Sequence, residues 1–315
     1  MKMLVSGAAG FIGAPLIDEL LKRGHSVIAL VRSSVPQRWS QLANLEIMRL
    51  DLRERAALSL KDKSIDVVVH LAAATRGPPD KQVEDTVMST ANLLSAVRDA
   101  GIRRLVGISS LAILDCRAAP PLSVIDERTP IADDRSVSSY AAAKIRQERL
   151  FVEFAHNVGN SCSILRPGLV YDQTRITPGH AGVIRAHVGI LVSHRGEVPA
   201  VEVHSLAAAI ANAAEEALVG CEVMHVVDDH LPNQSVYLAA LRRRGLLPRT
   251  TLTVDWRLLQ AVCGIAASVL GWGGFGDRAP DVLQPKSFAV RLKPFRFSNS
   301  KAKRLLQWVP AGQFA

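Results

Sequence analysis

Short apolar runs alternate with segments of helical periodicity along the first half of the chain. The runs are rich in valine, isoleucine and leucine and lie at 1–7, 25–32, 45–52, 65–73, 103–110 and 161–168. Segments with apolar residues three or four positions apart fall between them, at 11–24, 80–100 and 139–157. Strands that are apolar on both faces are typical of a parallel sheet covered by helices on both sides. The pattern therefore predicts an α/β fold, a Rossmann-like doubly wound parallel sheet.

The regular alternation fades beyond residue 170. A further helix is expected at 203–218 and a further strand at 222–229. We expect residues 1–170 to form the main α/β domain, which the chain rejoins at about 200–230. Residues 171–315 are expected to form mostly a smaller C-terminal lobe.

One stretch, residues 258–276, carries no charged side chain over nineteen positions, which approaches the length of a membrane span. Five glycines, a glutamine and a serine interrupt it. We therefore expect a buried or surface-lying helix of about twelve residues followed by a loop, and no membrane span. Met1 leads directly into the first apolar run, so we expect no signal peptide and a cytoplasmic protein.

The net charge of +9 indicates a protein that attracts anions. Its basic residues are dispersed and few aromatic residues lie among them, so we expect phosphate-bearing small molecules as partners and no nucleic acid. The four cysteines are far apart and form no CxxC pair, which favours a reducing compartment. The histidines show neither HxxxH nor HExxH spacing, so we expect no metal site.

A glycine-rich turn, VSGAAGFIG, joins the first apolar run to the first helical segment. Gly7 permits a tight turn, Gly10 lets the backbone approach an anion, and Gly13 allows the helix to pack closely. The free N–H groups and the dipole at the start of that helix favour a diphosphate. Within a strand–helix–strand unit, this turn predicts a dinucleotide-binding loop.

The end of the second apolar run, LVRSS, bears on the choice of dinucleotide. Arg32 suits a 2′-phosphate and favours NADP, with Ser33 and Ser34 as additional donors. An exposed arginine that stacks on adenine would instead accept NAD. Asp51 ends the third run and could bond the adenine amine, and a cap at the end of the strand is an equally good interpretation.

The stretch SSYAAAK at 138–144 places a phenol and an ammonium four residues apart. Three alanines between them favour a helix, so Tyr140 and Lys144 would lie on one face, about one turn apart. By itself the stretch is equally compatible with an ordinary helix surface.

Together these motifs resemble the extended short-chain dehydrogenase/reductase family, the NAD(P)-dependent epimerase/dehydratase group. The turn is similar to the family's TGxxGxxG loop, with Ser6 in place of threonine. The further motifs follow in the family's order: VVVHLAA (67–73), RRLVGISS (103–110), YAAAK (140–144), LRPGLVYD (165–172), VVDD (226–229) and FSNSKAKRLLQWVP (297–310). The region LPRTTLTVDWRLLQAVCGIAASVLG resembles the nucleotide-sugar epimerases and 4-ketoreductases of polysaccharide synthesis.

The resemblance implies a catalytic group. Tyr140 would be the general acid/base, Lys144 its assistant and Ser110 a second donor to the substrate oxygen, with Ser109 as the alternative in the neighbouring register. The Lys144 ammonium and the positive nicotinamide ring of the oxidised cofactor are expected to lower the pKa of Tyr140 from its ordinary value near 10. The implied cofactor contacts are Gly7, Gly10, Phe11, Ile12, Gly13, Arg32, Asp51, Leu52, Leu71, Ala72, Ala73, Lys144 and Pro167.

Two positions depart from the family's pattern. Thr86 stands where many relatives have asparagine, which puts a role for that position in doubt. Gly168 and Leu169 follow LRP, where several sugar-nucleotide enzymes carry an asparagine that holds the substrate. Arg175 and Arg185 lie just beyond and could bind a substrate diphosphate, although solvated loop arginines are an equally good interpretation.

The resemblance predicts an NAD(P)-dependent epimerase or 4-ketoreductase acting on a nucleotide sugar, with hydride transfer at nicotinamide C4. The alternative is an NADPH-dependent reductase of a non-sugar ketone, steroid- or flavonoid-like. A non-catalytic NADP(H) sensor is a third hypothesis, which the retained tyrosine and lysine disfavour. A homodimer is the candidate assembly.

Overall fold

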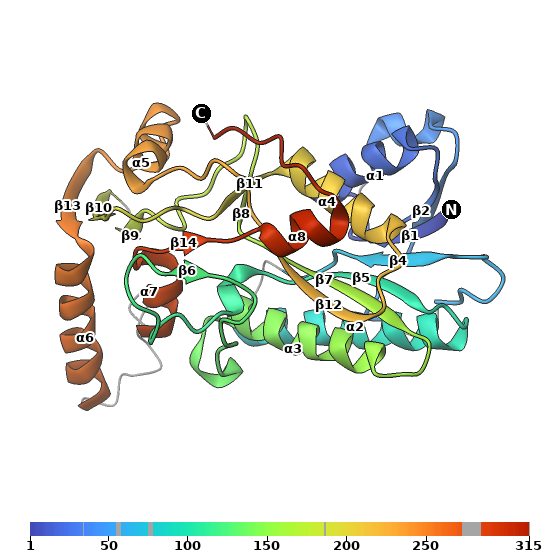
Figure 1. The fold of residues 1–315 in the computed structure, drawn as a ribbon, viewed down its shortest axis with the longest axis horizontal. Coiled ribbons are helices and arrows are strands. Elements are labelled where there is room, and N and C mark those ends of the chain that lie inside the picture. Colours follow the sequence, from blue (N-terminus) through green and yellow to red (C-terminus); the bar gives the residue numbers. More distant parts are fainter. Residues whose placement is uncertain (34, 55–57, 75–77, 186, 273–284, 315) are drawn as a thin grey trace.

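The computed structural model describes residues 1–33, 35–54, 58–74, 78–185, 187–272 and 285–314. Figure 1 shows a central sheet with helices above and below it, and a second group of strands and helices at one end. The expected Rossmann-like doubly wound architecture is confirmed.

The main sheet has seven parallel strands in the order β12-β7-β5-β4-β1-β2-β3. Its strands are β1 (Lys2–Ser6), β2 (Ser26–Val31), β3 (Leu45–Arg49), β4 (Val67–His70), β5 (Arg104–Ile108), β7 (Ser161–Pro167) and β12 (Gly220–Val226). Six of them coincide with the apolar runs, and β12 overlaps the further strand expected at 222–229. The strand order reverses direction beside β1, and the carboxyl ends at such a switch point form the usual ligand crevice of this architecture.

Two helix pairs cover the two faces of this sheet. Helices α1 (Gly13–Lys22) and α4 (Val203–Glu215) pack on one face, and α2 (Pro79–Asp99) and α3 (Ser139–Ala155) pack on the other (Figure 1). Side chains alternate between the two cores along a strand, because Met3 and Val5 join one hydrophobic cluster and Leu4 joins the other. The apolar runs therefore serve both faces at once.

The remaining strands form smaller sheets beside the main one. Strand β10 (Val188–Ser193) lies between β9 (Gly182–Arg185) and β13 (Thr250–Asp255), while β8 (Leu169–Tyr171) pairs with β11 (Ala200–Glu202), and β6 (Val124–Ile125) with β14 (Arg296–Phe297). Helices α5 (Gln234–Arg243), α6 (Trp256–Trp272) and α7 (Pro285–Leu292) accompany them, and short 3₁₀ turns lie at Gln37–Gln41, Leu111–Ile113 and Asp134–Ser136. The segment between β5 and α3 thus contributes a strand, β6, to this second group.

Helix α6 corresponds to the uncharged stretch and is seventeen residues long, where about twelve were expected. It lies on the surface, because Trp256 and Leu259 are buried while Leu258, Val262 and Ile265 are exposed. Within the described residues, no helix is long and apolar enough to cross a membrane. The last positions of the stretch, 273–276, lie outside the described residues.

The C-terminal residues return to the main sheet. Helix α8 (Ser300–Leu306) packs on α4 and β12, and the indole N–H of Trp308 donates to the carbonyl of Ser205 at 3.0 Å. The Ala311 N–H donates to the hydroxyl of the same serine at 3.2 Å. The Phe314 ring then meets the ring of Tyr171, with their centroids 4.8 Å apart.

Asp228 is a buried carboxylate beneath this tail. It accepts hydrogen bonds from the Tyr171 hydroxyl at 3.1 Å and from the Glu202 N–H at 2.9 Å, and only 3% of it is exposed. The backbone at Gly312 packs so tightly on the carboxylate that a β-carbon there would collide with it. Burial raises the pKa of Asp228 to about 6.

We predict that Asp228→Asn stabilises the protein more at about pH 7.5 than at about pH 4.5. Because folding raises the pKa of Asp228, it favours the protonated carboxyl, and that contribution is lost as pH rises through about 6. Ionisation of the buried group therefore costs roughly 2–3 kcal/mol at neutral pH, and the difference in Tm between variant and wild type should grow by about 5 °C between the two pH values.

Asp229→Asn is the matched control, measured by thermal unfolding at the same two pH values. Burial opposes ionisation of Asp229, but hydrogen bonds from Lys303 and Asn299 outweigh it and lower its pKa. This control should lose stability relative to wild type as pH rises. Equal Tm differences for Asp228→Asn at both pH values would contradict the prediction.

Candidate active site

The glycine-rich turn runs from β1 to the start of α1. Gly7 has φ of +67°, a left-handed conformation that favours glycine, and a β-carbon there would lie 2.9 Å from the Ala72 nitrogen. A β-carbon at Gly13 would collide with the Gly7 carbonyl. The turn, the helix start and the 71–73 segment after β4 therefore pack against each other through backbone atoms. A turn of this kind at the start of a helix can bind a diphosphate.

A side chain from beyond the main sheet reaches this turn. The Arg175 guanidinium lies over the Phe11 ring, 4.5 Å from its centroid. The backbone N–H of Arg175 is held by the Asp172 carboxylate, so its loop is ordered by a local hydrogen bond. Ile12 stands at the N-cap of α1. The Arg185 side chain lies outside the described residues.

Charged side chains gather where β2 and β3 end. Arg32 is exposed at the end of β2 and acts electrostatically on Asp51. The Asp51 carboxylate accepts two-pronged hydrogen bonds from Arg53, the shortest being 2.6 Å, and these bonds lower its pKa to about 2. Arg53 also reaches Asp85 on α2 at 3.2 Å. Sequence reasoning missed Arg53, although the Asp-x-Arg spacing that forms this fork was visible.

The other expected cofactor contacts lie at the carboxyl edge of the sheet. Leu71, Ala72 and Ala73 are half-buried beside the glycine turn, and Ser33 is exposed after β2, while Ser34 lies outside the described residues. Leu52 is buried, and its carbonyl accepts a hydrogen bond from the Asn92 amide at 2.8 Å. Pro167 ends β7 and is buried.

Tyr140 lies in the first turn of α3. The turn is capped by the Ser138 hydroxyl, which accepts from the Ala141 N–H. Tyr140 is 36% exposed, and its hydroxyl interacts with Ser110, which lies after β5. By contrast, the Ser109 hydroxyl is buried with no hydrogen-bond partner among the described residues. The geometry thus brings Ser110, and not its neighbour, to the phenol.

In the protein alone the pKa of Tyr140 is shifted upward, and the downward shift expected beside the oxidised cofactor stays a prediction. Burial raises this pKa, and the hydrogen bond with Ser110 only partly offsets that effect. The expectation relied on the Lys144 ammonium and on the charge of an oxidised nicotinamide. The Lys144 ammonium instead donates to the Ile108 carbonyl at 2.7 Å and to the Gln147 amide oxygen at 2.8 Å.

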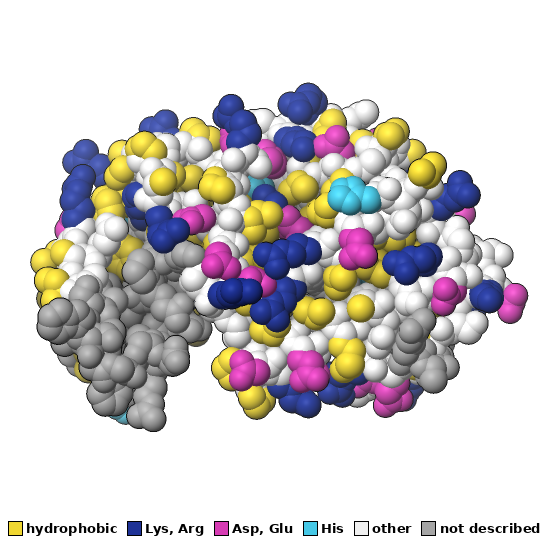
Figure 2. Space-filling model, turned by 90° about the horizontal axis from the view of Figure 1, so that it is seen from below, with side chains coloured by type: hydrophobic (Ala, Val, Ile, Leu, Met, Phe, Trp, Pro, Cys, Tyr) yellow, Lys and Arg dark blue, Asp and Glu magenta, His cyan; other side chains and the backbone are white. Residues whose placement is uncertain are grey.

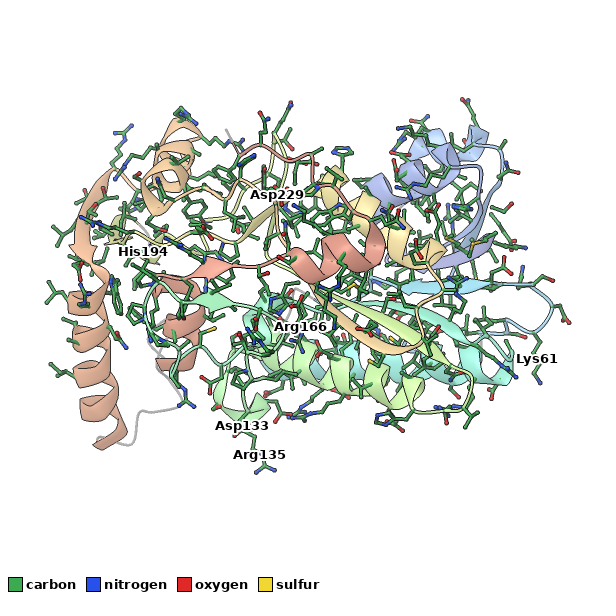
Figure 3. All side chains as sticks on the ribbon, viewed as in Figure 1. Lys61, Asp133, Arg135, Arg166, His194 and Asp229 are labelled. Atoms are coloured by element: carbon green, nitrogen blue, oxygen red, sulfur yellow. The ribbon has the colours of Figure 1, made fainter. Side chains whose placement is uncertain are left out.

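Lys144 is almost fully buried, with 4% of its surface exposed. Burial lowers its pKa to about 8, although the nearby Glu148 carboxylate opposes this. Glu148 is itself paired with Arg166, with a guanidinium-to-carboxylate distance of 2.5 Å, and both side chains are 4% exposed. Figure 3 labels Arg166 near the centre of the molecule, between the sheet and α3.

Further polar side chains, which the sequence did not single out, lie behind the lysine. His70 at the end of β4 is fully buried between the Ser6 hydroxyl, at 2.6 Å, and the Thr90 hydroxyl, at 2.9 Å. Thr86, the position of doubt, accepts from the Ala74 N–H at 3.0 Å and so anchors the loop after β4. Thr86, which aligns with the family's asparagine, therefore holds this loop in place.

Gly168 is the second departure, and its backbone explains the missing asparagine. Leu169 donates its N–H to the Pro199 carbonyl at 2.6 Å, where β8 joins β11. A β-carbon at Gly168 would collide with that carbonyl. No side chain fits at this position unless β8 moves away from β11.

Charges of both signs are mixed over the face drawn in Figure 2. Lysine and arginine side chains alternate there with aspartate and glutamate, so this face carries no single-sign stripe of the kind that binds nucleic acid. Among the described residues, no group of three or more histidine, cysteine, aspartate or glutamate side chains could hold a metal ion.

Comparison with known proteins relates the chain to several enzymes. It is 33% identical to 4-hydroxy-2-methyl-3-oxo-4-farnesyl-3,4-dihydroquinoline-1-oxide ketoreductase of Stigmatella aurantiaca, over 59% of this chain and 55% of the relative. It is 31% identical to UDP-glucose 4-epimerase of Mycolicibacterium smegmatis, over 62% of this chain and 64% of the relative. The chain therefore spans little more than half the length of the first relative and under two thirds of the second.

Solved structures share the fold over nearly the whole chain. The structure of MoeE5 in complex with UDP-glucuronic acid and NAD superposes with a TM-score of 0.69, covering 99% of this chain and 95% of that one at 22% identity. The model of the NAD dependent epimerase/dehydratase family matches residues 3–213, about two thirds of the sequence and all of the motifs up to α4. On this match, the chain belongs to the NAD dependent epimerase/dehydratase family.

Proposed function

We propose that this protein is an NADP-dependent oxidoreductase that reduces a ketone on a nucleotide sugar, either as a 4-ketoreductase or as one half-reaction of an epimerase. The observation that carries the proposal is the contact of Tyr140 with Ser110 one helical turn from the buried Lys144, at the same sheet edge as the glycine turn. Such a set can donate a proton to a carbonyl oxygen and hold the resulting charge.

The cofactor supplies or accepts hydride at nicotinamide C4, and the chain's own residues handle the proton. In the reductive direction, the Tyr140 hydroxyl gives its proton to the ketone oxygen as the carbonyl carbon gains hydride, and Ser110 donates to the same oxygen. A tyrosine with an ordinary pKa near 10 is protonated at neutral pH, and the upward shift of the Tyr140 pKa keeps it so. A neutral phenol is ready to act as an acid, which supports the reductive direction.

The cofactor proposal favours NADP over NAD. Arg32 is exposed at the end of β2, where a 2′-phosphate would lie in this fold. Asp51 is engaged by Arg53 and is therefore a weak candidate for a free adenine or ribose partner.

The substrate proposal is supported by Arg175 and by one relative. Arg175 lies against the glycine turn, so its guanidinium can reach a diphosphate in the crevice. UDP-glucose 4-epimerase, one of the relatives, is named for a nucleotide sugar. The second candidate, reduction of a non-sugar ketone, is favoured by Gly168, which removes a side-chain contact to a sugar nucleotide, and by the ketoreductase relative.

We predict that Tyr140→Phe lowers kcat/KM for ketone reduction by about 10³-fold or more, because the proton donor is lost. Ser110→Ala should cost about 10- to 100-fold, which corresponds to one hydrogen bond to developing charge. Initial rates at the nicotinamide absorbance band measure both, and cofactor Kd should change less than about two-fold.

Ser109→Ala is the matched control for this pair, since its hydroxyl is buried and makes no bond among the described residues. It should retain rates close to wild type. Retention of more than about a tenth of the activity by Tyr140→Phe would show that another group moves the proton.

We predict that Arg32→Ala lowers the preference for NADPH over NADH by about ten-fold or more, expressed as the ratio of kcat/KM values. A charge-assisted bond to the 2′-phosphate contributes about 1.5–3 kcal/mol, and only NADPH makes it. Arg38→Ala is the control, because Arg38 is exposed nearby but engaged by Asp18 at 2.7 Å. A ratio unchanged by Arg32→Ala would sink the 2′-phosphate assignment.

We predict that UDP-, dTDP- or GDP-sugars raise the Tm of the NADPH complex and that a 4-keto sugar nucleotide oxidises NADPH. Arg175→Ala should weaken the sugar-nucleotide Kd by about ten-fold, because a diphosphate loses a charged partner. Arg249→Ala, an exposed arginine of the same lobe, should leave it unchanged. Turnover of aromatic or alkyl ketones without any response to nucleotide sugars would favour the second candidate.

A further inference from the structure

Gln147 is a fully buried glutamine in the third turn of α3. Its amide oxygen accepts from the Lys144 ammonium at 2.8 Å. Its amide nitrogen donates to the Thr90 hydroxyl at 2.9 Å and to the Ala72 carbonyl at 3.1 Å. Its side chain is 0% exposed. Both donors and the oxygen of this amide are therefore used inside the protein.

The neighbours of Gln147 fix which way its amide points. The lysine ammonium is only a donor and the Ala72 carbonyl is only an acceptor. Rotating the amide by half a turn would set NH₂ against NH₃⁺ and oxygen against oxygen. The oxygen of Gln147 must therefore face Lys144, whichever way the other groups are protonated.

The same bonds continue to the strand that carries the glycine turn. The Thr90 hydroxyl gives its proton to the Thr86 carbonyl at 2.7 Å, so it accepts from both the Gln147 amide and His70 Nε2. Burial lowers the pKa of His70 to about 3, which makes it neutral, and its Nδ1 then accepts from the Ser6 hydroxyl. The Ser6 oxygen in turn accepts from the Ala72 N–H at 3.3 Å. Each donor in this chain thus meets one acceptor.

We propose that Gln147 is a positioning residue for Lys144. The Gln147 amide oxygen and the Ile108 carbonyl hold the buried ammonium one helical turn from Tyr140. The proposal deepens the proposed function and rests on it for the catalytic meaning of Lys144. The ammonium has three N–H donors, and two of them are met by these acceptors among the described residues.

A consequence for protonation follows from the same geometry. A buried ammonium persists only where acceptors compensate for the water it has lost. Without the Gln147 oxygen, Lys144 would keep one acceptor and would lose its proton at lower pH. With a carboxylate at 147, it would hold its proton to higher pH, since an opposite charge favours the ionised form.

The test compares Gln147→Met, Gln147→Glu and the control Gln234→Met. Gln234 is an equally buried glutamine in the second lobe, whose amide donates to the His180 carbonyl at 2.8 Å, so its loss reports on stability alone. The first readout needs no activity. The ¹³Cε signal of Lys144, identified by its absence in Lys144→Met, is titrated by NMR in protein carrying labelled lysine.

We expect Gln147→Met to lower the Lys144 midpoint by about one pH unit, Gln147→Glu to raise it by at least as much, and Gln234→Met to leave it unchanged. The second readout is the pH profile of ketone reduction. Because the protonated fraction falls ten-fold per unit above the midpoint, Gln147→Met should lose about ten-fold in kcat above pH 8, with substrate KM within about two-fold. Gln147→Glu should recover most of that loss.

The outcomes separate this proposal from the proposed function. Midpoint shifts in the expected directions with no turnover of any ketone would uphold the positioning role and overturn the enzymatic one. An unshifted midpoint in both Gln147 variants, with stability losses like those of Gln234→Met, would overturn the positioning role even where Tyr140→Phe abolishes turnover.

Discussion

A buried ammonium on one helix is the constraint on which this site depends. Lys144 cannot be left without acceptors in the interior, and it finds them at the Ile108 carbonyl at the end of β5 and at Gln147 on its own helix. Glu148, one position further, is bound by Arg166 of β7. Lys144 and Glu148, about one turn apart, thus connect α3 to the neighbouring strands β5 and β7. These bonds set the register of α3 on the sheet, and that register decides where Tyr140 stands.

Burial moves the two central pKa values in opposite directions, because it disfavours whichever form is charged. The pKa of the Tyr140 phenol rises and that of the Lys144 ammonium falls to about 8. The protein alone therefore holds a neutral phenol beside a lysine that titrates in the weakly alkaline range. At neutral pH the phenol is therefore in its protonated form, which can only donate a proton and cannot accept one. The same residues can act as a base only when additional positive charge lowers the pKa of the phenol.

The sequence predicted well those features that depend on local spacing. The seven strands of the main sheet and helices α1 to α4 follow from apolar periodicity, and Tyr140 and Lys144 share a helix face because they are four residues apart. Gln147, His70 and Thr90 escaped notice because each is an ordinary polar residue in sequence. The bond between Gln147 and Thr90 joins positions 57 residues apart, and the bond between His70 and Thr90 joins positions 20 residues apart. Only the packing of α3 and α2 on one face of the sheet brings these residues together.

Failures of prediction arose from burial and from long-range contacts. The upward shift of the Tyr140 pKa in the protein alone was missed because the sequence shows its charged neighbour but not the loss of water around its hydroxyl. The fork between Asp51 and Arg53 was also missed, and the contact of Asp51 with the adenine stays a prediction. The length of α6 was underestimated because the glycine-rich end of the stretch was expected to be a loop, whereas the helix begins at Trp256 and continues through Gly271 to Trp272.

The residues proposed to handle the proton and those proposed to face the substrate come from different elements. Tyr140 and Lys144 lie on α3, and Ser110 follows β5. Gly168 and Arg175 follow β7, further along the segment that the family model matches. The Pro199 carbonyl leaves no room for a side chain at Gly168, and Asp172 holds the Arg175 N–H. Changes in this second part can alter the substrate without disturbing the proton chemistry. The chain is correspondingly similar, over about three fifths of its length, both to a quinoline-oxide ketoreductase and to a UDP-glucose 4-epimerase.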